Sequence, residues 1–219
     1  VSTPGFDPNT FARGITQSEW RDLLDSPERP LNNKSIAGVY PPGSTYKMVT
    51  ALAALESKAI EPWTRLPCNG FIELGSIKFH CWLKGGHGST NVVEALAQSC
   101  DCFFYEAARK AGIDRISDMA NRLGFGRQSD LGLPGESTGI QPSRSWKQEK
   151  LGKPWQHGDT FNLGIGQGYM AATPLQLAIM TARIANGGYE VQPNLLLASA
   201  TSREELAPPA PRDKPSAPS

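Results

Sequence analysis

The hydrophobic and polar positions of this chain follow a helical spacing over most of its length. Apolar residues recur at intervals of three and four, and Thr16 with Glu19 forms a capping-box pattern ahead of the first such run. Pro174 stands at the first position of the last run, and two glycines follow its end. The pattern predicts helices over about residues 17–26, 44–60, 92–111, 113–123 and 174–186.

Residues 64–90 change from this spacing to that of a short β-hairpin. Two four-residue segments, Phe71–Leu74 and Ile77–His80, flank the turn dipeptide Gly-Ser. Residues 126–159 are polar, with interspersed Gly, Pro and Trp, so we expect a long functional loop there. Residues 199–219 are rich in Pro, Ala and charge and cannot bury a core, so we expect a mobile tail or a truncated linker.

A serine and a lysine, Ser44 and Lys47, stand three residues apart at the start of the second predicted helix. At that spacing the two side chains share one face of the first turn, where the helix dipole favours developing negative charge. A lysine so placed can remove the hydroxyl proton and activate the serine as a nucleophile. A capping serine followed by a solvated lysine satisfies the same pattern, and both interpretations stay open at this point.

The composition is that of an ordinary globular protein, with 219 residues, 39% of them hydrophobic, and a formal net charge of +1. The near-neutral charge and the lack of a basic stripe argue against nucleic acid as a partner. No apolar run reaches the roughly 18 residues of a membrane span, and no signal peptide opens the chain. Because the chain lacks an initiator Met, we expect it to be a piece of a longer protein whose membrane anchor, if any, was removed.

Cysteine and histidine positions indicate a metal site. The spacing is Cys68-x12-Cys81-x5-His87-x12-Cys100. Three thiolates and an imidazole are a tetrahedral zinc set, although this spacing is not that of a standard zinc finger. Cys102 would then be a spare, buried thiol. The alternatives are a Cys68–Cys81 disulfide, which an even cysteine count favours in proteins that are exported, and free thiols.

Several ordered motifs together resemble the transpeptidase domain of class B penicillin-binding proteins. They are Tyr-Pro-Pro-Gly-Ser-Thr-Tyr-Lys at 40–47, Ser-x-Asp at 99–101, Gly-Ile-Gly-Gln-Gly at 164–168 and Thr-Pro-Leu-Gln at 173–176. The opening Ser-Thr-Pro-Gly-Phe-Asp-Pro-Asn and the stretch Ser-Cys-Asp-Cys-Phe-Phe-Tyr resemble the elongation, rod-shape type. The resemblance covers about residues 1–198, and such a series is far more specific than Ser-x-x-Lys alone.

The resemblance implies a serine D,D-transpeptidase that cross-links peptidoglycan stem peptides and is acylated by β-lactams. Ser44 would be the nucleophile and Lys47 its base, with the backbone N–H of Ser44 as one oxyanion donor. Ser99 would relay protons toward the leaving amine. Asp101 stands where most relatives carry Asn, and the Asp form resembles the elongation type.

The resemblance also implies binding residues. Gly166, Gln167 and Gly168 would border the substrate groove. Close backbone packing is an alternative for these glycines; a phosphate-binding loop is another, but no βαβ context supports it. Members of the elongation type resemble this chain in having a metal site of mixed ligands, which we carry over to a structural zinc held by Cys68, Cys81, His87 and Cys100. The five tryptophans, Trp20, Trp63, Trp82, Trp146 and Trp155, are expected in the core or the groove wall.

One departure from the family pattern limits these expectations. The third family motif, Lys-Thr/Ser-Gly on a strand, is absent from the 219 residues. We therefore expect the α/β penicillin-binding/serine β-lactamase-like fold to be represented mainly by its helical subdomain. Residues 1–198 would form a partial transpeptidase domain with a zinc-binding insert at about 64–102. This piece alone is expected to have little transpeptidase activity.

The full-length protein is expected at the periplasmic face of the bacterial inner membrane, anchored by an N-terminal helix and partnered by the membrane glycosyltransferase of the elongation complex. Two other functions stay open. One is a non-catalytic, zinc-stabilised scaffold or β-lactam sensor. The other is a β-lactamase relative, which needs a deacylating carboxylate over Ser44; Glu106, Glu136 and Glu149 are available, but the sequence nominates none of them.

Overall fold

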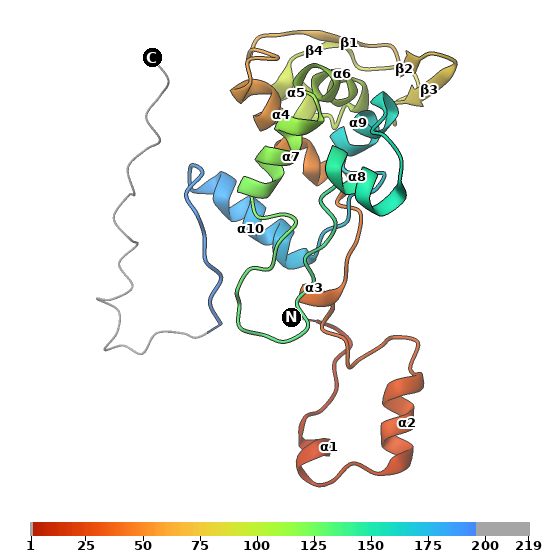
Figure 1. The fold of residues 1–219 in the computed structure, drawn as a ribbon, viewed down its shortest axis with the longest axis vertical. Coiled ribbons are helices and arrows are strands. Elements are labelled where there is room, and N and C mark those ends of the chain that lie inside the picture. Colours follow the sequence, from red (N-terminus) through yellow and green to blue (C-terminus); the bar gives the residue numbers. More distant parts are fainter. Residues whose placement is uncertain (1, 196–219) are drawn as a thin grey trace, which may run out of the picture.

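Helices make up most of the architecture, and the strands are short and lie together at one end of the molecule (Figure 1). The computed structural model describes residues 2–195. The helices are α1 (Asn9–Ala12), α2 (Gln17–Asp25), α3 (Lys34–Ala37), the 3₁₀ helix η1 (Gly43–Tyr46), α4 (Lys47–Glu56), α5 (Val92–Ala97), α6 (Asp101–Ala111), α7 (Ile113–Arg122), α8 (Arg144–Leu151), α9 (His157–Gly164) and α10 (Pro174–Ala185). The strands are β1 (Leu66–Cys68), β2 (Phe71–Leu74), β3 (Ile77–His80) and β4 (Gly88–Thr90).

Helix α6 is the centre of the core. It packs against α4, α7, α9 and β1. Phe103 and Phe104 of α6 are fully buried, as are Val49 of α4 and Ile116 of α7. Burial of each such side chain is worth roughly 1.5–3 kcal/mol, so this cluster fixes where α4 and α6 lie relative to each other. That placement matters because both helices begin beside the candidate site.

The four strands form two separate two-stranded antiparallel sheets. β2 and β3 pair as the predicted hairpin, with Phe71 opposite His80 and Leu74 opposite Ile77 around the Gly-Ser turn. β1 and β4 pair with Leu66 opposite Thr90. The prediction of a hairpin at this position is confirmed.

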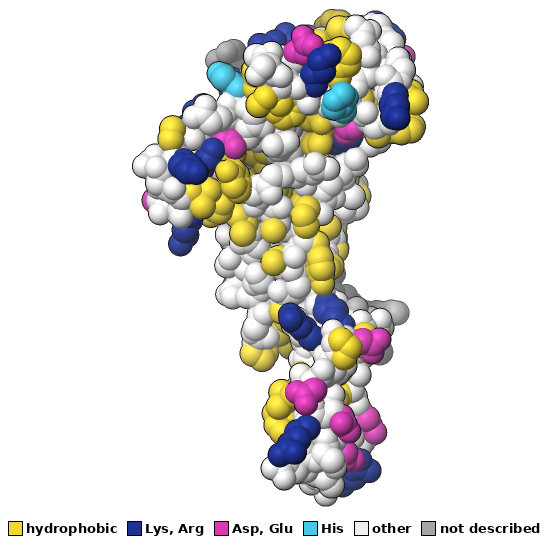
Figure 2. Space-filling view, turned by 90° about the vertical axis from the view of Figure 1, so that its right-hand side faces the viewer, with side chains coloured by type: hydrophobic (Ala, Val, Ile, Leu, Met, Phe, Trp, Pro, Cys, Tyr) yellow, Lys and Arg dark blue, Asp and Glu magenta, His cyan; other side chains and the backbone are white. Residues whose placement is uncertain are grey.

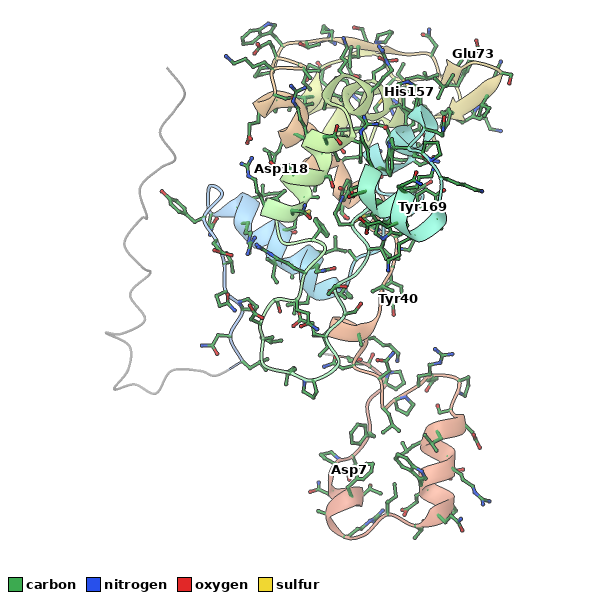
Figure 3. All side chains as sticks on the ribbon, viewed as in Figure 1. Asp7, Tyr40, Glu73, Asp118, His157 and Tyr169 are labelled. Atoms are coloured by element: carbon green, nitrogen blue, oxygen red, sulfur yellow. The ribbon has the colours of Figure 1, made fainter. Side chains whose placement is uncertain are left out.

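Helices α1 and α2 form an arm that extends away from the main body, and Asp7 lies on it, at the opposite end from Glu73 of the hairpin (Figures 1 and 3). Neither helix of the arm contains a buried residue. Figure 2 shows charged side chains of both signs on this narrow extension. The capping box of Thr16 and Glu19 is present as predicted.

Three predicted element boundaries were wrong. The helix expected over 44–60 is a 3₁₀ turn followed by α4, which ends at Glu56. The helix expected over 92–111 is interrupted at residues 98–100, between α5 and α6. The segment 126–159 contains α8, capped by the Ser143 hydroxyl and ended by Gly152 in the left-handed conformation, and also the start of α9. The tail predicted over 199–219 lies outside the described residues.

Candidate active site and metal centre

Ser44 lies in η1, immediately before α4. Its backbone N–H belongs to the first turn, where helical N–H groups have no partner within the helix. The turn is held from the side, because the N–H of Gly43 donates to the carbonyl of Gly166 (2.9 Å). A Cβ on Gly166 would come within 2.7 Å of the Tyr46 Cβ. Only glycine therefore fits where this segment supports the turn.

The hydroxyl groups of Ser44 and Ser99 and the amine of Lys47 converge. Ser99 Oγ donates to Ser44 Oγ (2.9 Å), and Lys47 Nζ donates to Ser99 Oγ (2.9 Å) and to the Ser99 carbonyl (2.8 Å). The Ser99 hydroxyl thus stands between the nucleophile candidate and the lysine. The structure brings together three groups that the sequence placed in two separate motifs.

Ser99 adopts a left-handed backbone conformation, with φ of +52°, which is uncommon for any residue other than glycine. Its N–H donates to the carbonyl of Leu96 (3.2 Å), and the N–H of Cys100 donates to the carbonyl of Ala95 (2.9 Å). This is the hydrogen-bond pattern of a Schellman motif, which normally ends a helix with glycine. The end of α5 therefore interrupts the predicted continuous helix and turns Ser99 toward Ser44.

Asp101 is the first residue of α6, and both of its carboxylate oxygens accept hydrogen bonds. Oδ1 accepts from Lys47 Nζ (2.6 Å), and Oδ2 accepts from the backbone N–H of Trp82 (3.1 Å). The Trp82 indole N–H donates to the carbonyl of Gln98 (3.1 Å). The N-terminal end of α6 also favours a carboxylate through the helix dipole.

Lys47 is buried, with its side chain 1% exposed, whereas that of Asp101 is 14% exposed. The three hydrogen bonds to Ser99 and Asp101 use all three protons of its ammonium group, whose nitrogen lies 5.6 Å from the centroid of the Phe104 ring. A buried cation is tolerated only when it is paired in this way. The solvated lysine of the alternative interpretation is therefore wrong.

Cys68, Cys81, His87 and Cys100 form one cluster. One ligand atom from each residue lies within 4.8 Å of all the others, the only such group of His, Cys, Asp or Glu among residues 2–195. The four residues come from the end of β1, the residue after β3, the residue before β4 and the residue before α6. Folding therefore assembles the group from four separate segments.

The distances within the cluster suit a tetrahedral ion. His87 Nδ1 lies 3.6 Å from Cys68 Sγ and 3.5 Å from Cys81 Sγ. Bonds of about 2.3 Å to sulfur and about 2.0 Å to nitrogen at the tetrahedral angle separate the two atoms by about 3.5 Å. The cysteines carry no disulfide in the structure, so the predicted Cys68–Cys81 alternative is not what the structure contains.

The thiols of the cluster differ in how readily they ionise. Burial opposes ionisation of Cys68, but N–H groups of Gly70 and His87 outweigh it and lower the pKa of Cys68 to about 6. Burial raises the pKa of Cys100 to about 12. Cys102 is a buried free thiol outside the cluster, as predicted. Burial raises its pKa as well. A cation in the cluster would supply the positive charge that a Cys100 thiolate needs.

The remaining sequence-predicted residues have different surroundings. Gly166 is buried against the backbone of Gly43, whereas Gln167 and Gly168 are exposed. Their predicted contact with substrate stays a prediction. Trp63 and Trp82 are 74% and 63% exposed, so neither lies in the core, which was one of the two places predicted for the tryptophans. Sequence reasoning missed the role of Trp82, and its place next to Cys81 was the one available signal.

The comparisons with known proteins agree on one family. The family model described as penicillin binding protein transpeptidase domain matches residues 1–218. The peptidoglycan D,D-transpeptidase MrdA of Escherichia coli (strain K12) is 41% identical over 217 residues, which are 98% of this chain and 34% of the relative. The chain thus spans about a third of the length of the curated relatives it matches.

Solved structures are similar over most of the described residues. PBP2 of Pseudomonas aeruginosa in complex with WCK 5153 has a TM-score of 0.84 at 42% identity, covering 89% of this chain and 44% of that one. PBP2 of Helicobacter pylori in a complex with MreC has a TM-score of 0.85 at 38% identity, covering 89% and 36%. Every helix within residues 2–195 is too short or too polar to cross a bilayer.

Proposed function

The chain belongs to the family of penicillin-binding protein transpeptidase domains, and on that premise we propose that it supplies the nucleophile and the proton relay of a peptidoglycan D,D-transpeptidase. Its fold is the penicillin-binding/β-lactamase-like fold of its structural neighbours, here mostly helical with few strands. The proposed reaction passes through an acyl-enzyme on Ser44. β-Lactams would acylate the same hydroxyl.

The observation that carries this proposal is the chain of hydrogen bonds from Ser44 through Ser99 to Lys47 and Asp101. As Ser44 Oγ bonds to the carbonyl carbon of a stem peptide, its proton passes to Ser99, whose own proton passes to a Lys47 amine that is uncharged at that moment. The reverse transfer protonates the leaving amine when the peptide bond breaks. An acceptor amine then attacks the ester, the relay takes up the proton that this amine loses, and it returns a proton to the Ser44 oxygen as that oxygen leaves.

The carbonyl oxygen gains negative charge in each step. The Ser44 N–H at the start of η1 is one donor for it. The second donor would come from a Lys-Thr/Ser-Gly strand, which these 219 residues do not contain. Since losing one oxyanion donor costs about 10²–10³ in rate, we propose that this chain alone acylates poorly and needs that strand from a longer protein.

We further propose a structural zinc ion in the cluster of Cys68, Cys81, His87 and Cys100. The ligand set and the separations of 3.5 and 3.6 Å support it. Cys100 lies between Ser99 and Asp101 in the sequence, so an ion bound to Cys100 would restrain the position of both neighbours. When bound, the ion supplies order, and no step of the reaction takes place on it.

We infer the partners and the location of the full-length protein from its relatives. MrdA of Escherichia coli is named a peptidoglycan transpeptidase, and the Helicobacter pylori neighbour was solved with MreC. We propose that the full-length protein acts in cell elongation at the periplasmic face of the inner membrane. Its substrates would be peptidoglycan stem peptides, and its companions an elongation-complex glycosyltransferase and a scaffold protein similar to MreC.

Labelling with a fluorescent penicillin tests the reaction in the longer protein that carries this chain. We expect one covalent label on the peptide that contains Ser44, no label in the S44A variant, and a rate at least ~100-fold lower for the 219-residue chain alone. Persistent labelling of S44A would refute the assignment of the nucleophile. A 219-residue chain that labels as fast as the longer protein would refute the need for a second strand.

Metal analysis of protein purified without added zinc tests the metal site separately. We expect one zinc per chain and four reduced thiols, with zinc lost in H87A and retained in H157A, a histidine variant outside the cluster. Metal-free protein with one disulfide would contradict the proposed zinc site. This result would leave the acyl-transfer proposal standing.

A further inference from the structure

Trp82 is an exposed residue with two specific hydrogen bonds. The residue is 63% exposed, so burial does not account for its position. Its backbone N–H donates to Asp101 Oδ2 and its indole N–H donates to the carbonyl of Gln98, each over 3.1 Å. Both acceptors belong to the segment that carries Ser99. Trp82 is therefore hydrogen-bonded to this segment on both sides of the relay serine.

The same residue is joined to the metal cluster. Trp82 directly follows Cys81, and its ring lies 5.4 Å from the His87 ring, in an edge-on arrangement. β3, whose end leads to Cys81, lies at the same end of the molecule as α6 (Figure 1). Trp82 thus connects two ligands of the cluster with residues 98–101 along a path separate from Cys100.

The two hydrogen bonds act on different parts of the site. The bond to Asp101 holds the carboxylate that pairs with Lys47. The bond to Gln98 holds the last peptide before Ser99, whose left-handed conformation must be maintained by its surroundings. A loss of either bond would loosen the position of the relay hydroxyl without removing any group that exchanges protons.

From these contacts we propose that Trp82 is a positioning residue that transmits the order of the metal loop to the Ser99 relay. The inference rests on the proposed acyl-transfer and zinc functions. With the ion bound, residues 81–87 are fixed, and Trp82 holds residues 98–101 in register with Lys47. Without the ion, residues 81–87 move, and the two hydrogen bonds of Trp82 no longer orient the Ser99 hydroxyl. The effect of the bound metal on the position of Ser99 therefore passes through the hydrogen bonds of Trp82, including that of its indole N–H.

The test is a four-state comparison in the longer protein that carries this chain. Wild type and W82F are each prepared zinc-loaded and chelator-treated, and acylation by a fluorescent penicillin is timed. The matched control is W63F, which makes the same change at another exposed tryptophan, before β1. A second variant replaces Trp82 with benzothienylalanine, which keeps the ring size and lacks the N–H donor. Hydrogen exchange of the peptides covering 66–90 and 96–104 is measured in every state.

We expect zinc-loaded W82F and the benzothienylalanine variant to keep one zinc per chain and to acylate about tenfold more slowly, the effect of one lost hydrogen bond. Exchange should rise in 96–104 and stay unchanged in 66–90. Chelation should slow wild type and W63F equally and strongly, but slow W82F much less, because two changes on one connection are not additive.

The inference is overturned if W82F behaves as W63F does, if it loses its zinc, or if the effects of chelation and substitution simply multiply. These results would leave the proposed function intact. A wild-type protein that is not labelled, or that holds no zinc, would instead contradict the proposed function itself. The two failures are therefore distinguishable by the wild-type controls alone.

Discussion

Replacing Asp101 with Asn is the change whose outcome the structure predicts most sharply. Both carboxylate oxygens of Asp101 accept a hydrogen bond, one from Lys47 Nζ over 2.6 Å and one from the Trp82 N–H over 3.1 Å. An amide has one oxygen. In D101N, the amide NH₂ group therefore faces a donor on one side, whichever way the amide is turned.

The magnitude follows from burial. The Lys47 side chain is 1% exposed and that of Asp101 is 14% exposed, so solvent does not compensate for the lost charge. A hydrogen bond between charged groups contributes about 1.5–3 kcal/mol, and one buried donor also loses its acceptor. We expect D101N to cost about 3 kcal/mol of stability, which for a domain of this size lowers the melting temperature by about 6–12 °C.

The assay uses the longer protein that carries this chain, with thermal unfolding and penicillin acylation measured on the same preparations. The matched control is D114N, because Asp114 pairs with Arg144 on the surface, with side chains 73% and 59% exposed. Such exposed pairs contribute less than about 1 kcal/mol. We expect D101N to unfold earlier and to acylate more slowly than both wild type and D114N.

Equal melting temperatures for D101N and D114N would refute the argument that both carboxylate oxygens are required. Slower acylation without any loss of stability would place the effect of Asp101 in the reaction alone. That result would contradict the burial-based estimate while keeping the contact to Lys47.

Three further predictions concern single residues. S99G and S99A both lose the bridging hydroxyl and should both acylate at least ~100-fold more slowly, but S99G should be more stable than S99A by about 1 kcal/mol, because glycine adopts the φ of +52° without strain; an S99G variant no more stable than S99A would contradict the backbone argument. G86A should lower zinc content, because a Cβ there would overlap the backbone of β1, whereas G75A, in the open hairpin turn, should keep its zinc; equal zinc content would contradict this. The hydrogen bond from Arg122 lowers the pKa of Glu56 below 4.5, so the pair stabilises the protein above that pH and the benefit is lost as pH falls through the folded-state pKa. Denaturant unfolding of E56Q should show a cost under about 1 kcal/mol at pH 7 that shrinks below pH 4.5, and a cost independent of pH would disprove the linkage.

Local features were predictable because neighbouring residues determine them. The capping box at Thr16, the helix start at Thr173-Pro174, the hairpin around its Gly-Ser turn, and the spacing of Ser44 and Lys47 at the start of a helix all depend on residues that are close together in the sequence. The predicted metal ligands also lie together in the structure. They could be predicted because Cys and His are recognised as candidate ligands by residue type alone. Elements that rely on less distinctive residues, such as α8, were missed.

The sequence by itself determined the identity of the reactive groups and the short helices that carry them. The tertiary structure decided which of these groups meet: Ser99 lies 55 residues from Ser44, and it reaches that serine because α5 ends in a Schellman motif and α6 packs against α4. The tertiary structure also decided that Trp82 forms hydrogen bonds with the segment that carries Ser99. The physical reason is that local hydrogen bonds fix one turn at a time, whereas contacts between distant segments depend on which faces are buried together in one core.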